Sequence, residues 1–300
     1  MKQTLRYALA VLMLALLVAC GAGTSGTTAG TASVPDAASG TDAGITAAPE
    51  TTSGTDAGTA SGAAAGGLPD LGGRTVVIGT DATYPPFESV DTATNQIVGF
   101  DVDLMNEIAK LINIKPEFKN ADFKTIFTAL QAKEFDAVMS ASTITEERKQ
   151  IVAFSDPYID VGQLIVTTAG NEKVKGVADL ANGVAVGVQT GTTGEEAART
   201  EAKVPDDMLK RYDTIDLAFA DLANNSIDAV VADGPTVGNY TSQPQYSGKL
   251  AIVGEPFTTE SYGIAVNQSD TELLNAINAA LTQIKGGNTL QQLKDKHKIK

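Results

Sequence analysis

The sequence has little of the chemistry that metal sites and many enzymes use. Among 300 residues there is one cysteine, Cys20, and one histidine, His297. A zinc site needs several Cys or His ligands, and a Ser-His or Cys-His nucleophile needs a histidine beside it. His297 lies among three lysines near the end of the chain, which is typical of a solvent-exposed helix end. We therefore expect no metal, no cofactor and no enzymatic activity of this kind.

Basic residues are absent between Arg6 and Arg74. Residues 21–73 consist almost entirely of Gly, Ala, Ser, Thr, Pro and Asp, a composition that cannot bury a core. The sequence therefore predicts a disordered linker over residues 20–73. A flexible coil of roughly 50 residues spans about 40 Å on average, which would let a folded domain stand away from a membrane.

The chain also lacks positive charge overall. Its formal charge is −14, and residues 74–300 keep −11 once the two basic residues of the first 19 positions and the five acidic residues of the linker are removed. A domain this acidic binds nucleic acid and anionic lipid poorly. We expect no nucleic-acid partner.

The first 19 residues have the features of an export signal. Lys2 and Arg6 give a basic start, and the apolar run from Tyr7 to Ala19 is too short to span a bilayer. The run ends in Leu-Val-Ala-Cys, which resembles the lipobox of bacterial lipoproteins, in which cleavage before the cysteine leaves it lipid-modified. The resemblance implies anchoring through Cys20 to the outer face of the cytoplasmic membrane. The alternative is an unmodified Cys20 in an uncleaved signal.

Strand-like runs alternate with helical patterns from residue 74 onward, which predicts an α/β domain with mostly parallel sheets. The strand pattern of Phe135–Met139 returns at Ile227–Val231, so the sequence predicts two similar lobes. The last strand, Tyr262–Val266, would rejoin the first sheet, and the chain would then cross between the lobes twice, at a hinge. The predicted lobes are 74–160 with 259–300, and 161–258. The other predicted elements are strands Val76–Gly79, Val161–Thr167 and Val184–Val188 and helices Asp103–Leu111, Asp122–Ala132, Asp270–Lys285 and Asn288–Lys298.

The stretch Ser140–Arg148 places polar groups and an arginine directly after a strand. Thr143 is followed three residues later by Glu146, a capping-box pattern that predicts a helix starting at Thr143 with Arg148 in its first turn. A guanidinium matches a carboxylate bidentately, and free N–H groups at a helix start add to such a site. On its own, the pattern fits two interpretations equally: a pocket for a small carboxylate, or a surface arginine on a solvated helix.

Further polar positions follow other strand-like runs. Asp81 and Tyr84 come after the first strand, Thr193 lies in a glycine-rich turn that opens a helix, and Asp233 ends a later strand. Open α/β sheets bind ligands at this edge. Each position alone also has a structural explanation, because Gly-rich turns and helix-capping aspartates are common. The turn at Thr193 lacks a Walker lysine, which argues against nucleotide binding.

Together these segments resemble the family 3 extracellular solute-binding proteins of ABC importers, the polar amino-acid type, over residues 74–300. The matching segments are Gly79–Asp81 with Tyr84–Phe87, Val98–Leu104, Thr143–Arg148, Phe154–Tyr158, Gln189–Gly194 and Asp228–Asp233. The resemblance implies an α/β, two-lobed periplasmic-binding-protein fold of type II, in which two Rossmann-like lobes are joined by a two-strand hinge.

The resemblance also implies which residues hold the backbone of an amino acid. Arg148 would bind the α-carboxylate, together with the backbone N–H groups of Thr143 and Thr193. Asp233, Thr143 and the Ala141 carbonyl would take the α-ammonium. Both charges need partners, because burial of an unpaired charge is costly.

The remaining ligand-binding residues that the resemblance implies surround the side chain of the amino acid. Tyr84 and Phe123 would enclose it, Asp81 would meet its far end, and Ser140 and Gln189 complete the set. Gln189 stands where glutamine-binding members can carry a lysine. Because Asp81 can pair with a cation and Tyr84 can stack on one, we expect arginine or lysine, with glutamine or histidine behind them.

The expected function is delivery of this amino acid to an ABC transporter permease by a monomeric binding protein. A sensor that reports the ligand to a membrane receptor is the first alternative. A dehydratase on the same fold is the second, and it is disfavoured because Asp81 and Asp233 both already have binding roles, whereas a catalytic acid or base must be free of them.

Overall fold

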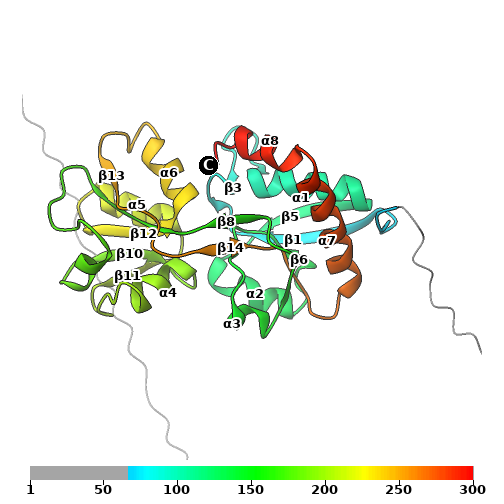
Figure 1. Cartoon of the computed structure of the whole chain (residues 1–300), viewed down its shortest axis with the longest axis horizontal. Helices are drawn as coiled ribbons and strands as arrows, with labels where there is room; N and C mark the ends of the chain where they lie inside the picture. The colour runs from blue at the N-terminus through cyan, green and yellow to red at the C-terminus, as the bar shows by residue number, and fades with distance from the viewer. Residues whose placement is uncertain (1–66, 300) are drawn as a thin grey trace, which may run out of the picture. The chain divides into compact units, whose positions relative to one another are not determined.

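The computed structural model describes residues 67–299, and these form two lobes (Figure 1). The first lobe is built on a sheet in the order β5-β1-β6-β15-β7. Strand β1 pairs in parallel with β5 and β6, whereas β15 runs antiparallel to β6 and β7. The strands are β1 (Arg74–Thr80), β5 (Ile114–Asn120), β6 (Ala137–Val138), β7 (Ala153–Phe154) and β15 (Ala265–Val266).

The helices of the first lobe form where the sequence has the helical period. In α1, Leu104, Ile108 and Ile112 are fully buried, as positions four residues apart on one helix face should be. The helices are α1 (Phe100–Ile112), α2 (Phe123–Gln131), α3 (Glu146–Lys149), α7 (Thr271–Gly286) and α8 (Thr289–Lys296). A small sheet of β2 (Thr83–Tyr84), β3 (Glu88–Val90) and β4 (Ile97–Val98) lies beside them.

The second lobe repeats the parallel pattern around β10. Its sheet has the order β11-β10-β12-β9-β13, with β10 parallel to β11 and β12 and with β9 antiparallel to both β12 and β13. The strands are β9 (Gln163–Thr168), β10 (Val186–Gln189), β11 (Leu209–Tyr212), β12 (Ala229–Asp233) and β13 (Leu250–Val253). The helices are the 3-10 helix η1 (Val177–Ala181), α4 (Thr193–Thr200), α5 (Ile215–Ala223) and α6 (Gly234–Ser242).

Two strands connect the lobes. β8 (Ile159–Val161) leads from the first lobe to the second and β14 (Glu260–Tyr262) leads back, and the two pair antiparallel across the middle of Figure 1. The predicted α/β fold with two lobes and a two-strand hinge is confirmed. Since β15 joins the first sheet, the chain completes the first lobe only after it has built the second.

The predicted single strand Tyr262–Val266 was wrong, because the segment divides into β14 and β15, which belong to different sheets. Gly263 lies at the division and donates its N–H to the Ser142 carbonyl at 3.0 Å. A Cβ at this glycine would come within 2.8 Å of Ile144 Cδ1. The close approach of these two segments turns the chain out of the hinge and into the first sheet.

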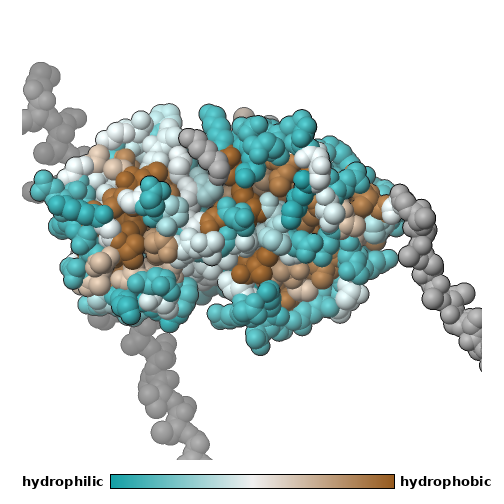
Figure 2. Space-filling model, viewed as in Figure 1, coloured by the Kyte–Doolittle hydropathy of each residue, from teal (hydrophilic) through white to brown (hydrophobic). Residues whose placement is uncertain are grey.

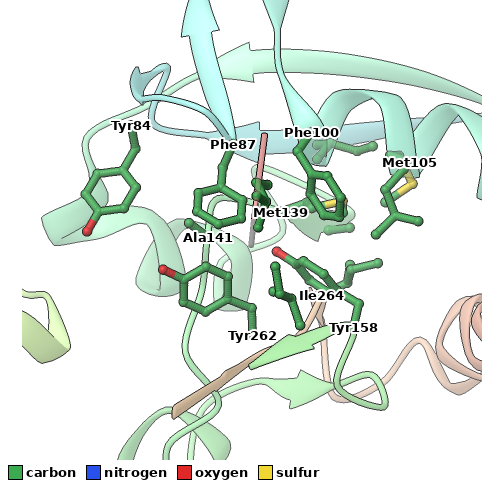
Figure 3. Packing of buried hydrophobic residues seen from close by; sticks show 14 of the residues in the cluster. Tyr84, Phe87, Phe100, Met105, Met139, Ala141, Tyr158, Tyr262 and Ile264 are labelled. Atoms are coloured by element: carbon green, nitrogen blue, oxygen red, sulfur yellow. The ribbon is translucent and has the colours of Figure 1, made fainter. Parts of the chain in front are cut away.

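An aromatic cluster fills the core of the first lobe next to the hinge (Figure 3). The ring of Phe87 lies 5.1 Å from Tyr262 and 5.9 Å from Phe100, edge to face, and Phe100 stacks on Tyr158 at 6.2 Å. Figure 3 shows Ala141 beside Phe87 and Tyr262. The cluster therefore packs against the turn at Ala141 from the core of the first lobe and supports its conformation.

The surface has the expected distribution of polarity. On the face shown in Figure 2, hydrophilic residues cover the outer rims, over α8 and α3, and apolar residues gather over the middle of each lobe. No helix within residues 67–299 is long and apolar enough to cross a membrane.

The signal segment and Cys20 lie outside the described residues. The end of the predicted linker is described, and it contacts the folded domain: Leu71 donates its N–H to the Ile112 carbonyl at 2.9 Å, and Asn113 Nδ2 donates to Asp70 at 2.7 Å. Asp70 and Leu71 thus already contact the first lobe, although the linker was predicted to extend to residue 73.

Candidate functional site

A narrow cavity, which the surrounding side chains nearly fill, lies between the two lobes. All ten residues predicted to bind a ligand line it, and so do two that sequence reasoning missed, Glu88 and Thr192. The ten are Asp81, Tyr84, Phe123, Ser140, Ala141, Thr143, Arg148, Gln189, Thr193 and Asp233.

The topology explains why residues distant in sequence meet here. Asp81 follows the end of β1 and Ser140 the end of β6, two parallel neighbours of the first sheet. Gln189 ends β10 and Asp233 ends β12, which are parallel neighbours in the second. The carboxyl ends of parallel strands form the ligand edge of an open α/β sheet, and here two such edges face each other.

Arg148 is buried, and within residues 67–299 its guanidinium bonds only to carbonyl oxygens: one nitrogen donates to the Thr143 carbonyl at 2.7 Å and another to the Gly191 carbonyl at 3.2 Å. The rings of Phe127 and Phe123 lie under it, with their centroids 4.6 and 5.2 Å from Cζ. Burial lowers the pKa of Arg148 to about 10, against the opposing effect of Asp233 and Glu260.

Among residues 67–299, no carboxylate forms an ion pair with this guanidinium. A buried cation without a paired anion is expensive. The arrangement is therefore suited to an anion that arrives from outside the chain.

The segment before Arg148 differs from its prediction. Helix α3 begins at Glu146 with Thr145 as its N-cap, and Thr145 Oγ1 accepts from the Arg148 N–H at 3.1 Å. The predicted capping box starting at Thr143 was wrong, because Thr143 is extended and forms an isolated β-bridge with Tyr262. Thr143 and Thr145 lie two residues apart, and the sequence alone does not show which of them caps the helix and which pairs with hinge strand β14.

Asp233 is a buried carboxylate contacted from both lobes. Gln163 Nε2 donates to its Oδ1 at 3.0 Å, and the Tyr84 hydroxyl, from the first lobe, donates to its Oδ2. Burial raises the pKa of Asp233 to about 7, and the charge of Glu260 adds to the effect. The carboxyl is thus poised to ionise when a cation approaches.

Asp81 is the second buried carboxylate of the cavity. Thr83 Oγ1 donates to its Oδ1 at 2.8 Å, and Gln189 Nε2, from the second lobe, donates to its Oδ2 at 2.6 Å. Burial raises the pKa of Asp81, while these hydrogen bonds act in the opposite direction. Its own N–H donates to Ser140 Oγ at 2.9 Å, which fixes the backbone at the end of β1.

Glu88, which lines the cavity, and Asp101 form a buried carboxyl pair. Ser140 Oγ donates to Glu88 at 3.1 Å, and Asp101 accepts from the Ala141 N–H at 2.8 Å. Burial raises the pKa of Glu88 well above its ordinary range and that of Asp101 to about 7, so the pair retains a proton. Ala141 has φ of 44°, a left-handed conformation that costs energy for a non-glycine residue. The Asp101 bond helps to hold this conformation.

Sequence reasoning missed Glu88 because it follows the Pro-Pro-Phe turn on a strand of only three residues, where nothing marks it as inward-facing. Tyr84 and Phe123 both line the cavity, but Phe123 lies against the Arg148 guanidinium. Their predicted enclosure of a ligand side chain stays a prediction.

No group of three or more Cys, His, Asp or Glu side chains within residues 67–299 is arranged to hold a metal ion. The cavity brings together one buried guanidinium, three buried carboxyls and threonine hydroxyls, a set of groups suited to charge pairing.

Comparison with known proteins identifies many relatives. Residues 76–299 match the family of bacterial extracellular solute-binding proteins, family 3. A probable histidine-binding protein of Neisseria gonorrhoeae is 37% identical over 213 residues, which cover 71% of this chain and 79% of that protein. ABC transporter arginine-binding protein 1 of Escherichia coli is 35% identical over 223 residues, 72% of this chain and 88% of that protein.

The fold comparison agrees. The solved structure of an ancestral arginine-binding protein bound to arginine is 42% identical, superposes with a TM-score of 0.69, and covers 74% of this chain and 97% of that one. The uncovered part of this chain corresponds in length to its N-terminal quarter, which precedes the matched residues.

Proposed function

The chain belongs to the family 3 bacterial extracellular solute-binding proteins, and from this we propose that it captures a polar L-amino acid between its lobes and delivers it to an ABC transporter permease. One observation carries the proposal: Arg148 is buried without a paired carboxylate among the described residues, beside a cavity whose other buried charges are carboxyls. A zwitterionic amino acid would supply both missing partners.

The backbone of the amino acid would bind at one end of the cavity. Its α-carboxylate would meet the Arg148 guanidinium and the N–H groups of Thr143 and Thr193. Its α-ammonium would meet Asp233, the Thr143 hydroxyl and the Ala141 carbonyl. The left-handed backbone at Ala141 and the raised pKa of Asp233 support these roles, since both features have a cost that a cationic partner offsets.

The side chain of the amino acid would extend toward Asp81, between Tyr84 and Phe123, with Gln189 and Ser140 alongside. Asp81 is held from both lobes and has capacity for another donor. A cationic side chain gains more from this carboxyl than a neutral amide does, so we favour arginine or lysine, then glutamine or histidine. The relatives named for arginine and histidine support a basic ligand.

The anchoring proposal concerns residues outside the structure. Residues 1–19 would be removed as a signal peptide, Cys20 would carry the lipid, and the linker to residue 73 would tether the lobes 74–160 with 259–300 and 161–258 at the outer face of the cytoplasmic membrane. We propose that the protein acts there as a monomer.

Two alternatives remain on this fold. A sensor would use the same pocket and differ only in the membrane partner. A dehydratase would need an acid or base that is free of ligand pairing. Glu88 and Asp101 share their environment with each other and with the backbone at Ala141, which favours a supporting role over catalysis.

The test is a thermal-shift screen of the full chain against the common amino acids, after unfolding and refolding have removed carried-over ligand. A stabilising shift confined to arginine, lysine or histidine would support a basic amino-acid receptor. A shift with many polar amino acids would keep the receptor and reject the role of Asp81. No shift with any amino acid would overturn the proposed function.

A further inference from the structure

Glu260 lies on the hinge strand β14, outside the set of residues that line the cavity, and its carboxylate joins groups from both lobes. Oε2 accepts hydrogen bonds from Thr143 Oγ1 at 2.8 Å and from Thr193 Oγ1 at 2.6 Å. Oε1 accepts from Thr258 Oγ1 at 2.8 Å and from Gln163 Nε2 at 3.0 Å. Four donors use the full acceptor capacity of an ionised carboxylate.

The two bonds to Oε2 differ in what they connect. Thr143 is tied to β14 by its own backbone, because it bridges with Tyr262 and its neighbour Ile144 donates its N–H to the Ser261 carbonyl at 2.9 Å. Thr193 is the first residue of α4, which packs on the sheet of the second lobe. Gln163 and Thr258, the donors to Oε1, lie in the second lobe as Thr193 does, so the bonds from Thr143 and Thr193 to Oε2 together join the two lobes across the hinge.

Opening of the lobes has to break this connection through Oε2. Rotation about β8 and β14 would separate α4 from Thr143, so Glu260 cannot keep both of its Oε2 bonds. A hydroxyl bonded to a carboxylate is charge-assisted and roughly twice as strong as a neutral hydrogen bond. The bonds of Tyr84 to Asp233 and of Gln189 to Asp81 also cross the cleft, but their carboxyls are those expected to hold the ligand.

We propose that Glu260 is a positioning residue that latches the lobes in the closed arrangement through Thr193, whether or not an amino acid is bound. Each of its four contacts is a protein group, so the latch raises the closed-to-open ratio before any ligand enters. A higher population of the closed form in turn slows the release of a bound ligand. Only this last consequence rests on the proposed function.

The experiment measures the distance between the lobes in the full chain. Cys20→Ser removes the native thiol, and spin labels are placed at Gln292→Cys on α8 and Gln245→Cys in the second lobe, both exposed positions. Glu260→Gln replaces one carboxylate oxygen by an NH₂ group, which cannot accept the hydrogen bonds that the threonine and glutamine side chains donate in the parent protein. Without ligand, we expect the closed-to-open ratio to fall about tenfold relative to the parent.

The matched control is Asp160→Asn, on the other hinge strand. Asp160 accepts a hydrogen bond from Ser261 Oγ at 2.6 Å and, within residues 67–299, bonds to neither Thr143 nor Thr193. Its ligand-free distance distribution should equal that of the parent. An unchanged ratio in Glu260→Gln, or an equal fall in Asp160→Asn, would overturn the latch.

Thr193→Val provides a second variant, which deletes the second-lobe donor to Oε2 and its contact with Thr143 Oγ1 at 3.2 Å but keeps the shape of the side chain. It should lower the ligand-free ratio as Glu260→Gln does and add nothing further in the Glu260→Gln background. A ratio equal to the parent's in Thr193→Val would reject the latch even if Glu260→Gln fails to fold. The distance measurement uses no ligand. If the closed-to-open ratio falls in the variants but no amino acid binds in the thermal-shift screen, the proposed function is rejected and the latch is kept.

Discussion

At the scale of single residues, the site buries one guanidinium and several carboxyls, and most of the groups that contact them are uncharged. Arg148 donates to carbonyl oxygens and lies over aromatic rings, whereas Asp81 and Asp233 accept hydrogen bonds from neutral donors. Neutral partners lower the cost of burial without satisfying the charge. The site is thus electrostatically incomplete at both ends, and single substitutions should have large and selective effects.

Arg148→Ala should weaken amino-acid binding by about 2–5 kcal/mol, or roughly thirtyfold to several thousandfold, because it leaves the ligand carboxylate buried without its partner. Isothermal titration calorimetry measures the change. Arg199→Ala is the control, since Arg199 lies exposed on α4 and forms an ion pair with Glu196 on the same helix. An unchanged affinity in Arg148→Ala would reject the pocket assignment.

Asp81→Asn should reduce the affinity for arginine at least about tenfold more than the affinity for glutamine, because it removes a charge that only a cationic side chain uses. Titration of one variant with both ligands gives the comparison. The amide keeps a hydrogen-bonding oxygen for Thr83 or Gln189. Equal losses for the two ligands would show that Asp81 does not select charge.

Binding should depend on pH through Asp233. Burial raises its pKa to about 7, above the ordinary value near 4. In the free protein this group contributes stability that is present below about pH 4 and lost as the pH rises through 7. A ligand ammonium favours the ionised form, so affinity should rise between about pH 5 and 7 and binding should release a proton.

Calorimetry in buffers of different ionisation enthalpy measures the released proton. The control is Asp233→Asn, in which the carboxyl is absent and the Asp233 share of the proton release should disappear. Proton release of the same size in both proteins would assign the effect to another group, such as Asp81, whose pKa is also raised.

Sequence reasoning identified most of the residues around the cavity because they end strands or open helices, where side chains of adjacent strands converge. It missed Glu88, which nothing in the sequence marks as inward-facing, and Thr192, which lies in the same glycine-rich turn as Thr193 and is the N-cap of α4. The pairing of Gln189 with Asp81 also could not be predicted, because it depends on how the two lobes meet.

At the scale of elements, the helical period in the sequence predicted α1, α2, α7 and α8 to within a few residues, because each buries a regular apolar face or follows a clear N-terminal signal. The two-residue strands β6, β7 and β15 are too short for a periodic pattern, and tertiary pairing sets their ends. The same holds for Thr143, which the hinge strand draws into an extended conformation.

Asp270→Ala should lower the free energy of unfolding by about 1–2 kcal/mol, because Asp270 caps α7 by accepting from the Leu273 N–H at 3.0 Å. Denaturant titration measures this. Asp270→Asn should retain most of the stability, since asparagine caps equally well. If Asp270→Asn loses as much as Asp270→Ala, the ion pair with Arg74 accounts for the effect instead.

At the scale of the whole molecule, the two-lobed arrangement followed from the repetition of one strand pattern within residues 74–300, and the two crossings followed from the order of the strands. The sequence pattern could not predict which residues contact each other across the cleft. Those contacts depend on the angle between the lobes, which no local pattern encodes.

Cys20→Ser should move the protein from the membrane fraction to the soluble fraction of its host, because a lipid-modified cysteine is the proposed anchor. Fractionation followed by immunodetection measures the distribution. Substitution of a nearby linker serine, Ser25→Ala, is the control and should leave the protein with the membrane. Membrane retention of Cys20→Ser would contradict lipid anchoring.

The order in which the chain visits the lobes has a consequence for its synthesis. Every strand of the second sheet, from β9 to β13, lies between two parts of the first sheet in the sequence. During translation the second lobe has therefore left the ribosome entirely while the first still lacks β15, α7 and α8, and domains fold as units as they emerge. The lobe that begins second can be finished first, and the nascent first lobe waits with β6 and β7 lacking their shared neighbour.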